Sequence, residues 1–155
     1  MKIAQVVCTP LAATPPRPVE FSMGAFTTFS AVIVDVRTDD GHAGVGECIV
    51  RRAPEVVATI VNRLLAPQAV GRDPWDVEGL WEEMLTLLRR WGHSRGFVLE
   101  ALSGIDIALW DLLSRAVGQP LYKFLAGAGR GGVRYYVSKV YFDEIPPWPR
   151  RPEGW

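Results

Sequence analysis

The chain has 155 residues, 48% of them hydrophobic and 22% charged, a composition typical of one globular domain with a hydrophobic core. Seventeen basic residues balance seventeen acidic ones, so the formal net charge is zero. Without a net positive field, neither nucleic acid nor an anionic membrane is an expected partner.

The two cysteines, Cys8 and Cys48, stand in apolar, strand-like surroundings, outside any C-x-x-C pair or histidine cluster. We predict reduced, buried thiols, with a disulfide or metal pair as the alternative. The N-terminal apolar run is too short for a secretory signal, and no stretch approaches the roughly 20 apolar residues that span a bilayer. A cytoplasmic location is the resulting expectation.

The first third of the chain has the pattern of strands. Residues 3–8 form a short apolar run that Pro10 is expected to end. Residues 30–38 alternate apolar and polar side chains, residues 42–50 follow as another strand, and Asp40-Gly41 between them is a hairpin-turn signal. These segments predict a three-stranded antiparallel meander.

Between the first two strands, residues 11–29 are too rich in proline and small residues for us to expect regular structure. The segment nevertheless carries large apolar side chains: Val19, Phe21, Met23, Phe26 and Phe29. A loop of this composition is expected to lie against another surface.

Three helices are predicted after residue 53. The first begins at Pro54 and ends near Gly71, and the second has Asp73 as its N-cap and runs to about Trp91. The third, residues 97–117, is apolar over most of its circumference, which is typical of a central helix. The helix that begins at Pro54 has apolar side chains at helical spacing: Val57, Ile60, Val61, Leu64 and Leu65.

The C-terminal region has a different composition. After a glycine-rich stretch, residues 133–142 alternate with strong strand formers. Residues 143–155 contain four prolines that break every helical turn, so we predict a disordered tail.

Four motifs together resemble the N-terminal capping domain of the mandelate racemase/muconate lactonizing enzyme group of the enolase superfamily, over about residues 1–130. They are G-H-A-G-V-G-E (41–47), G-R-D-P-W (71–75), A-L-S-G-I-D-I-A-L-W-D (101–111) and G-Q-P-L-Y-K-F-L (118–125). The resemblance implies an α+β fold, a three-stranded antiparallel meander followed by a helical bundle, with one orphan barrel-type strand near the C-terminus. It makes residues 131–142 a linker and first barrel strand.

In this family the cap precedes a (β/α) barrel, which takes about 250 residues by itself. The resemblance therefore implies a truncated member that lacks the catalytic barrel and has no activity alone. Intact members are Mg-dependent acid-sugar dehydratases, racemases or cycloisomerases that abstract a proton α to a carboxylate. No residue of this chain matches their base or metal positions, so we predict no catalytic residue, no metal ligand and no cofactor here, and an acid-sugar or carboxylate substrate only with a barrel.

The titratable groups favour structural roles. We expect Asp111 to pair with Arg115 on the same helix, Asp106 to be a buried hydrogen-bonding group, and His42 and His93 to be loop histidines. Three further candidates read as solvated groups rather than as a base or metal pair: Lys139, Asp143 and Glu144.

Substrate specificity is what the resemblance assigns to the cap itself, through two loops at residues 15–28 and 49–52. It implies an apolar wall over a substrate and two arginines that reach an acid substrate's charge: Val19, Phe21, Met23, Phe26, Arg51 and Arg52. The alternative is that the apolar residues only cover the meander.

Two other functions stay open. The chain could be a free-standing binding or dimerisation module, including a homo-oligomer, that uses exposed Phe21, Phe26, Trp148 and Trp155. It could also be a cap that complements a barrel on a separate chain.

Overall fold

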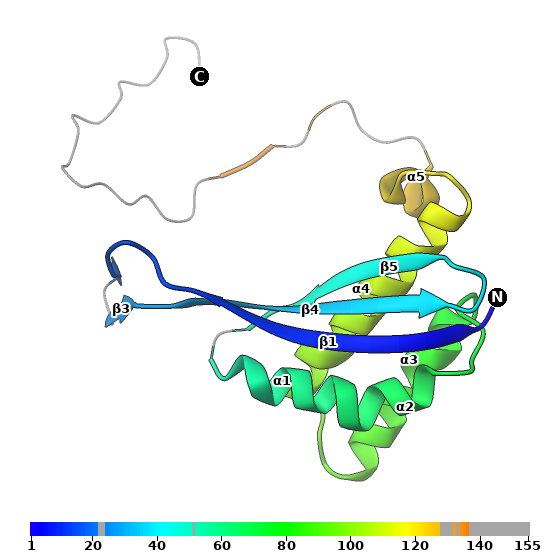
Figure 1. Ribbon diagram of the computed structural model, residues 1–155, viewed down its shortest axis with the longest axis horizontal. Helices are drawn as coiled ribbons and strands as arrows, with labels where there is room; N and C mark the ends of the chain where they lie inside the picture. The colour runs from blue at the N-terminus through cyan, green and yellow to red at the C-terminus, as the bar shows by residue number, and fades with distance from the viewer. Residues whose placement is uncertain (22–23, 51, 128–131, 133, 137–155) are drawn as a thin grey trace.

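The computed structural model describes residues 1–21, 24–50, 52–127, 132 and 134–136, except the side chain of Phe21. Five strands are followed by helices (Figure 1). The strands are β1 (Ile3–Ala13), β2 (Val19–Phe21), β3 (Gly24–Phe26), β4 (Phe29–Thr38) and β5 (Ala43–Cys48). The helices are α1 (Pro54–Ile60), the π-helical turn η1 (Val61–Leu65), α2 (Ala66–Ala69), α3 (Val77–Arg90), α4 (Phe97–Ala116) and α5 (Leu121–Ala126).

The main sheet has the antiparallel order β1-β4-β5, which confirms the predicted meander. Alternate residues of β4 and β5 are buried, and α4 and α1 pack against that face (Figure 1). The core lies between sheet and helices, so the fold is the α+β arrangement expected.

β1 is longer than predicted, because Pro10 does not end it. The backbone N–H and C=O of Cys8 both bond the side chain of Asn62 and therefore point away from β4. Pro10 lies two residues after Cys8, so its backbone nitrogen also points away from β4. The missing N–H of proline therefore costs no hydrogen bond between β1 and β4. The prediction that residues 11–29 have no regular structure was also wrong, because β2 and β3 form a short antiparallel hairpin within them.

The first predicted helix is confirmed, but it contains the π turn η1. Pro67 lies one turn after Arg63 and cannot donate to its carbonyl, and its ring would crowd that oxygen in an α-helix. The wider turn relieves this contact and rotates the helix face. Leu64, predicted on the buried stripe, is consequently 46% exposed.

α3 begins at Val77, not at Asp73 and Pro74 as predicted. The Asp73 carboxylate accepts from the backbone N–H of Trp75 at 3.0 Å, and its carbonyl accepts from Asp76 N–H at 3.2 Å. Asp73 therefore caps a separate turn before the helix, because its carboxylate already accepts a hydrogen bond from the backbone of Trp75.

α4 is the central helix, as its apolar circumference predicted, and it packs directly on β5. A Cβ added to Gly44 or Gly46 would stand closer than 3.0 Å to backbone atoms of α4, and one added to Gly104 would meet the Cys48 sulfur. These three glycines let helix and strand backbones touch. Two of the four motifs that carry the family resemblance, residues 41–47 and 101–111, are therefore packing motifs.

α4 ends where predicted, with Gly118 at a φ of +66°. Pro120 follows it and precedes α5. The predicted barrel-type strand and the tail fall mostly outside the described residues, and described residues 134–136 are not in a strand. The division at residues 130 and 142 stays a prediction.

Candidate functional site

The two predicted capping loops emerge from the same end of the main sheet. β4 is antiparallel to both neighbours, so its beginning lies beside the end of β1 and the end of β5. Ala13 pairs with Phe29, and Cys48 pairs with Val32. Figure 1 shows the hairpin that carries β3 extending beyond this end, far from the N-terminus. We call this end, with residues 15–28 and 49–53, the loop edge.

The hairpin contributes an apolar surface to the loop edge. Val19 and Phe26 are register partners in β2 and β3, and both side chains are half-buried. The ring of Phe26 lies 5.8 Å from that of Phe29, with 30° between the planes. The structure thus brings two predicted wall residues together, while the side chain of Phe21 and all of Met23 lie outside the described residues.

The second loop makes a strained entry into α1. Ala53 has a φ of +54°, a left-handed conformation that alanine rarely adopts, and Pro54 starts the helix. Arg52 is exposed at this turn, whereas Arg51 lies outside the described residues. One predicted arginine therefore lies exposed at the loop edge, with no ion pair to another described residue.

Three exposed apolar side chains of this edge were not among the predicted wall residues. Leu11 and Ile49 are each 52% exposed and Phe29 is 47% exposed, beside or at the strand ends. The pairing of β4 with both neighbours could have located them, because antiparallel register brings the first residues of one strand to the last residues of the next.

The histidine at the other end of the sheet belongs to a turn cluster. Thr38 Oγ1 donates to Asp40 Oδ1 at 2.5 Å, and His42 Nδ1 lies 3.1 Å from the same oxygen. These contacts hold the pKa of Asp40 at about 2. The carboxylate stands between hydroxyl and imidazole, so the histidine does not contact the hydroxyl as a general base would. His42 is a loop histidine, now with a defined partner.

The two cysteines are free and buried, as predicted. The Cys48 thiol donates to the carbonyl of Ala101 at 3.9 Å. The neighbouring Cys48 thiol lowers the pKa of Cys8 against the effect of burial, whereas Cys8 and burial together raise the pKa of Cys48. They lie on strands either side of β4, two strand spacings apart, or roughly 9–10 Å. That separation exceeds the span of a disulfide, so the alternative of a disulfide is disfavoured.

The helical carboxylates have structural partners. Asp111 Oδ2 accepts from Arg115 Nε at 2.9 Å, which confirms the predicted pair, and also from the backbone N–H of Val45 at 2.9 Å. Asp106 is half-buried; burial raises its pKa, and the neighbouring Trp110 side chain partly offsets that effect. Neither carboxylate is available as a base.

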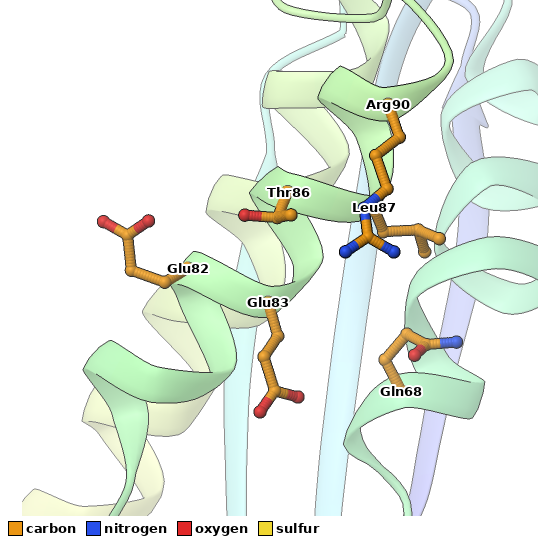
Figure 2. Close-up of a pocket in the computed structure, with 6 residues that line it drawn as sticks. All are labelled: Gln68, Glu82, Glu83, Thr86, Leu87 and Arg90. Atoms are coloured by element: carbon orange, nitrogen blue, oxygen red, sulfur yellow. The ribbon is translucent and has the colours of Figure 1, made fainter.

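The helical face carries shallow hollows rather than a catalytic cleft. One of about 340 Å³ lies between α2 and α3 (Figure 2), where Glu82 points away from the other labelled groups and Arg90 reaches toward Gln68. Glu83 in this hollow is bound by Arg72. His93 lines a different, apolar hollow with Leu64, Leu87, Leu88 and Trp91.

Within the described ranges, no three His, Cys, Asp or Glu side chains are grouped to hold a metal ion. The described residues therefore do not fit the Mg²⁺ that the family implies. Among the described helices, none has the length and apolar character needed to cross a membrane.

Comparison with known proteins agrees with this arrangement of strands and helices. A racemase from Streptomyces coelicolor A3(2), solved with bound magnesium, superposes with a TM-score of 0.74 at 30% identity, over 81% of this chain and 36% of that one. The structure is therefore that of an enolase-superfamily N-terminal domain. Residues 3–126 match the N-terminal domain of mandelate racemase / muconate lactonizing enzyme, and the chain belongs to this family.

Curated relatives are enzymes of acid sugars. Arabinonate dehydratase from Saccharolobus solfataricus is 33% identical over 113 residues, which is 73% of this chain and 30% of the relative. D-galactarolactone cycloisomerase from Agrobacterium fabrum is 36% identical over 121 residues, 78% of this chain and 31% of the relative. The chain spans about a third of the length of these proteins.

Proposed function

We propose that this domain is the substrate-capping part of an Mg-dependent acid-sugar dehydratase, racemase or cycloisomerase. The observation that carries the proposal is the convergence of both loops at one end of the sheet. The names of the relatives supply the substrate class, a sugar-derived carboxylate.

The loop edge suits a cover. Phe26, Phe29 and Ile49 offer apolar surface that would exclude water from a substrate beneath them. Excluding water strengthens the electrostatic interactions of the enclosed reaction. Arg52, with Arg51 beside it in sequence, would add a cation for the carboxylate of the substrate.

The domain would select and enclose the substrate without transforming it. His42 and Asp40 are engaged in a turn at the other end of the sheet, and Asp111 and Asp106 are engaged in helix contacts. The family resemblance assigns proton abstraction and the Mg²⁺ to the barrel. We therefore expect no acid-sugar dehydration by this chain alone.

A chimera tests this function. Residues 1–126 are fused to the barrel of the arabinonate dehydratase from Saccharolobus solfataricus, and dehydration of arabinonate is compared with that of the barrel alone. We expect the chimera to be the more active protein. A folded chimera no more active than the barrel alone would refute the capping role.

Adding the chain to the barrel as a separate polypeptide is the second arm. Because the same loop edge would cover a barrel on another chain, restored activity in this mixture would assign the domain to complementation.

A further inference from the structure

A groove lined by aromatic rings runs along α3 where it meets α4 and α5. Two hollows, of about 240 and 390 Å³, share the lining residues Val77, Glu78 and Trp110 and therefore adjoin. We call them together the tryptophan groove. Its other lining residues are Trp75, Asp76, Trp81, Glu82, Asp106, Leu113 and Phe124.

The aromatic walls are held in place yet accessible. Trp75 is 50% exposed, and Trp81 is partly buried against the core. The rings of Trp110 and Phe124 are 6.0 Å apart, and both side chains are partly buried against the core. Rigid aromatic faces of this kind suit proline rings and guanidinium groups.

The groove is acidic. The described residues that line it include four carboxylates and no lysine, arginine or histidine. Asp76 lies 3.7 Å from Arg72, but Glu78 and Glu82 have no cation within 4.0 Å among the described residues. The free carboxylates therefore call for a cationic occupant.

We propose that residues 146–155 of this same chain, P-P-W-P-R-R-P-E-G-W, bind in the tryptophan groove. Four prolines favour an extended segment that packs on aromatic rings. Arg150 and Arg151 complement Glu78 and Glu82, and can also stack on the tryptophans. The inference is independent of the capping function.

The connection is long enough. Phe124 lines the groove, and α5 ends two residues later at Ala126. About 20 residues then lead to Pro146, a length that spans up to roughly 66 Å when extended. The segment can reach the groove of its own chain without a change in the described fold.

Paramagnetic broadening tests this contact in the full chain. A nitroxide label is attached through Gly154→Cys, while unlabelled wild-type protein checks that Cys8 and Cys48 do not react. The indole N–H signals of Trp75, Trp81 and Trp110 are expected to lose most of their intensity. Trp91, at the far end of α3 in another hollow, is expected to keep its signal.

Charge variants make the test specific. Glu78→Lys with Glu82→Lys should restore the three signals, and adding Arg150→Glu with Arg151→Glu should broaden them again. Glu47→Lys with Glu55→Lys changes the net charge equally on other surfaces and should leave the broadening intact.

Three outcomes would overturn the proposal. The first is equal broadening of Trp91, and the second is no broadening of the groove tryptophans. The third is broadening that appears only when labelled chains are mixed with isotope-enriched unlabelled chains, which would place the segment of a second copy in the groove. Loss of broadening in 1 M salt, where the Debye length is about 3 Å, would support the charge contribution.

Discussion

The side chain of Asn62 makes both hydrogen bonds that a neighbouring strand would make to Cys8. Its Oδ1 accepts from Cys8 N–H at 2.9 Å, and its Nδ2 donates to the Cys8 carbonyl at 2.9 Å. At the opposite edge, Asp111 accepts from Val45 N–H. Helix side chains thus occupy backbone groups on both outer strands of the sheet, which limits edge pairing with other chains.

We predict that Asn62→Leu destabilises the domain by about 1–3 kcal/mol. Leucine has a similar shape but cannot make the two hydrogen bonds, so the N–H and C=O of Cys8 lose their partner. Urea unfolding followed by circular dichroism measures the change. Gln68→Leu is the matched control, since Gln68 is an exposed amide of α2 in no described hydrogen bond. Equal stability of the two variants would show that the Asn62 contacts contribute nothing.

The contact of α4 with β5 yields a second prediction. Gly46→Ala should cost about 1–3 kcal/mol or more, because its Cβ meets the backbone of Gly104 and Ala108, which cannot move aside without shifting the helix. Gly104→Ala should destabilise the domain less, because the atom that its Cβ meets is the side-chain sulfur of Cys48. Adding Cys48→Ala to Gly104→Ala removes that sulfur and should recover part of the lost stability. Thermal unfolding of the single and double variants measures this coupling.

Gly132→Ala serves as the control for both glycines, because a Cβ there meets no atom within 4 Å. A Gly46→Ala protein as stable as this control would contradict the close approach of strand and helix.

The turn cluster predicts a pH dependence at the β4–β5 hairpin. The pKa of Asp40 is lowered to about 2, so its stabilising contribution is present above the ordinary value of 3.8 and is lost as the pH falls toward 2. Thr38→Val removes the largest cause and should raise the pKa toward the ordinary value. A carbon-detected NMR titration of the Asp40 carboxyl reports the midpoint. The same low midpoint in Thr38→Val would refute the hydroxyl's role.

The buried thiols should be inert in the folded protein. Cys8 is 4% exposed and Cys48 is fully buried, so a thiol reagent reaches them only after unfolding. We expect two thiols to react in guanidinium and none on the same timescale in buffer. Rapid reaction of either cysteine in buffer would contradict this account of the core.

Local sequence patterns predicted the meander and the central helix because alternation and helical periodicity report which face is buried. They failed where a residue's effect depends on its neighbours in space. Pro10 was interpreted as a strand end, although it lies at an outer edge that needs no N–H. Asp73 was interpreted as a helix cap, although its carboxylate is used two residues on.

The candidate site was predictable to a similar extent. The resemblance gave both loops, and the antiparallel order of the strands brings them to one end. Contacts such as Asn62 with Cys8 join residues 54 positions apart and have no local pattern. The aromatic and acidic residues of the tryptophan groove were separately visible in the sequence, but only the packing of α3 on α4 brings them together.

The Michaelis constant for arabinonate in the chimera tests the capping role of the loop edge most directly. Phe26→Ala and Arg52→Ala remove an apolar contact and a cation from the loops, while Trp91→Ala removes an exposed ring that lines a separate hollow beside α3. We predict that both loop variants raise KM about tenfold, as loss of roughly 1.4 kcal/mol of binding implies, and that Trp91→Ala leaves it unchanged. Unchanged KM in both loop variants of a folded, active chimera would contradict the account.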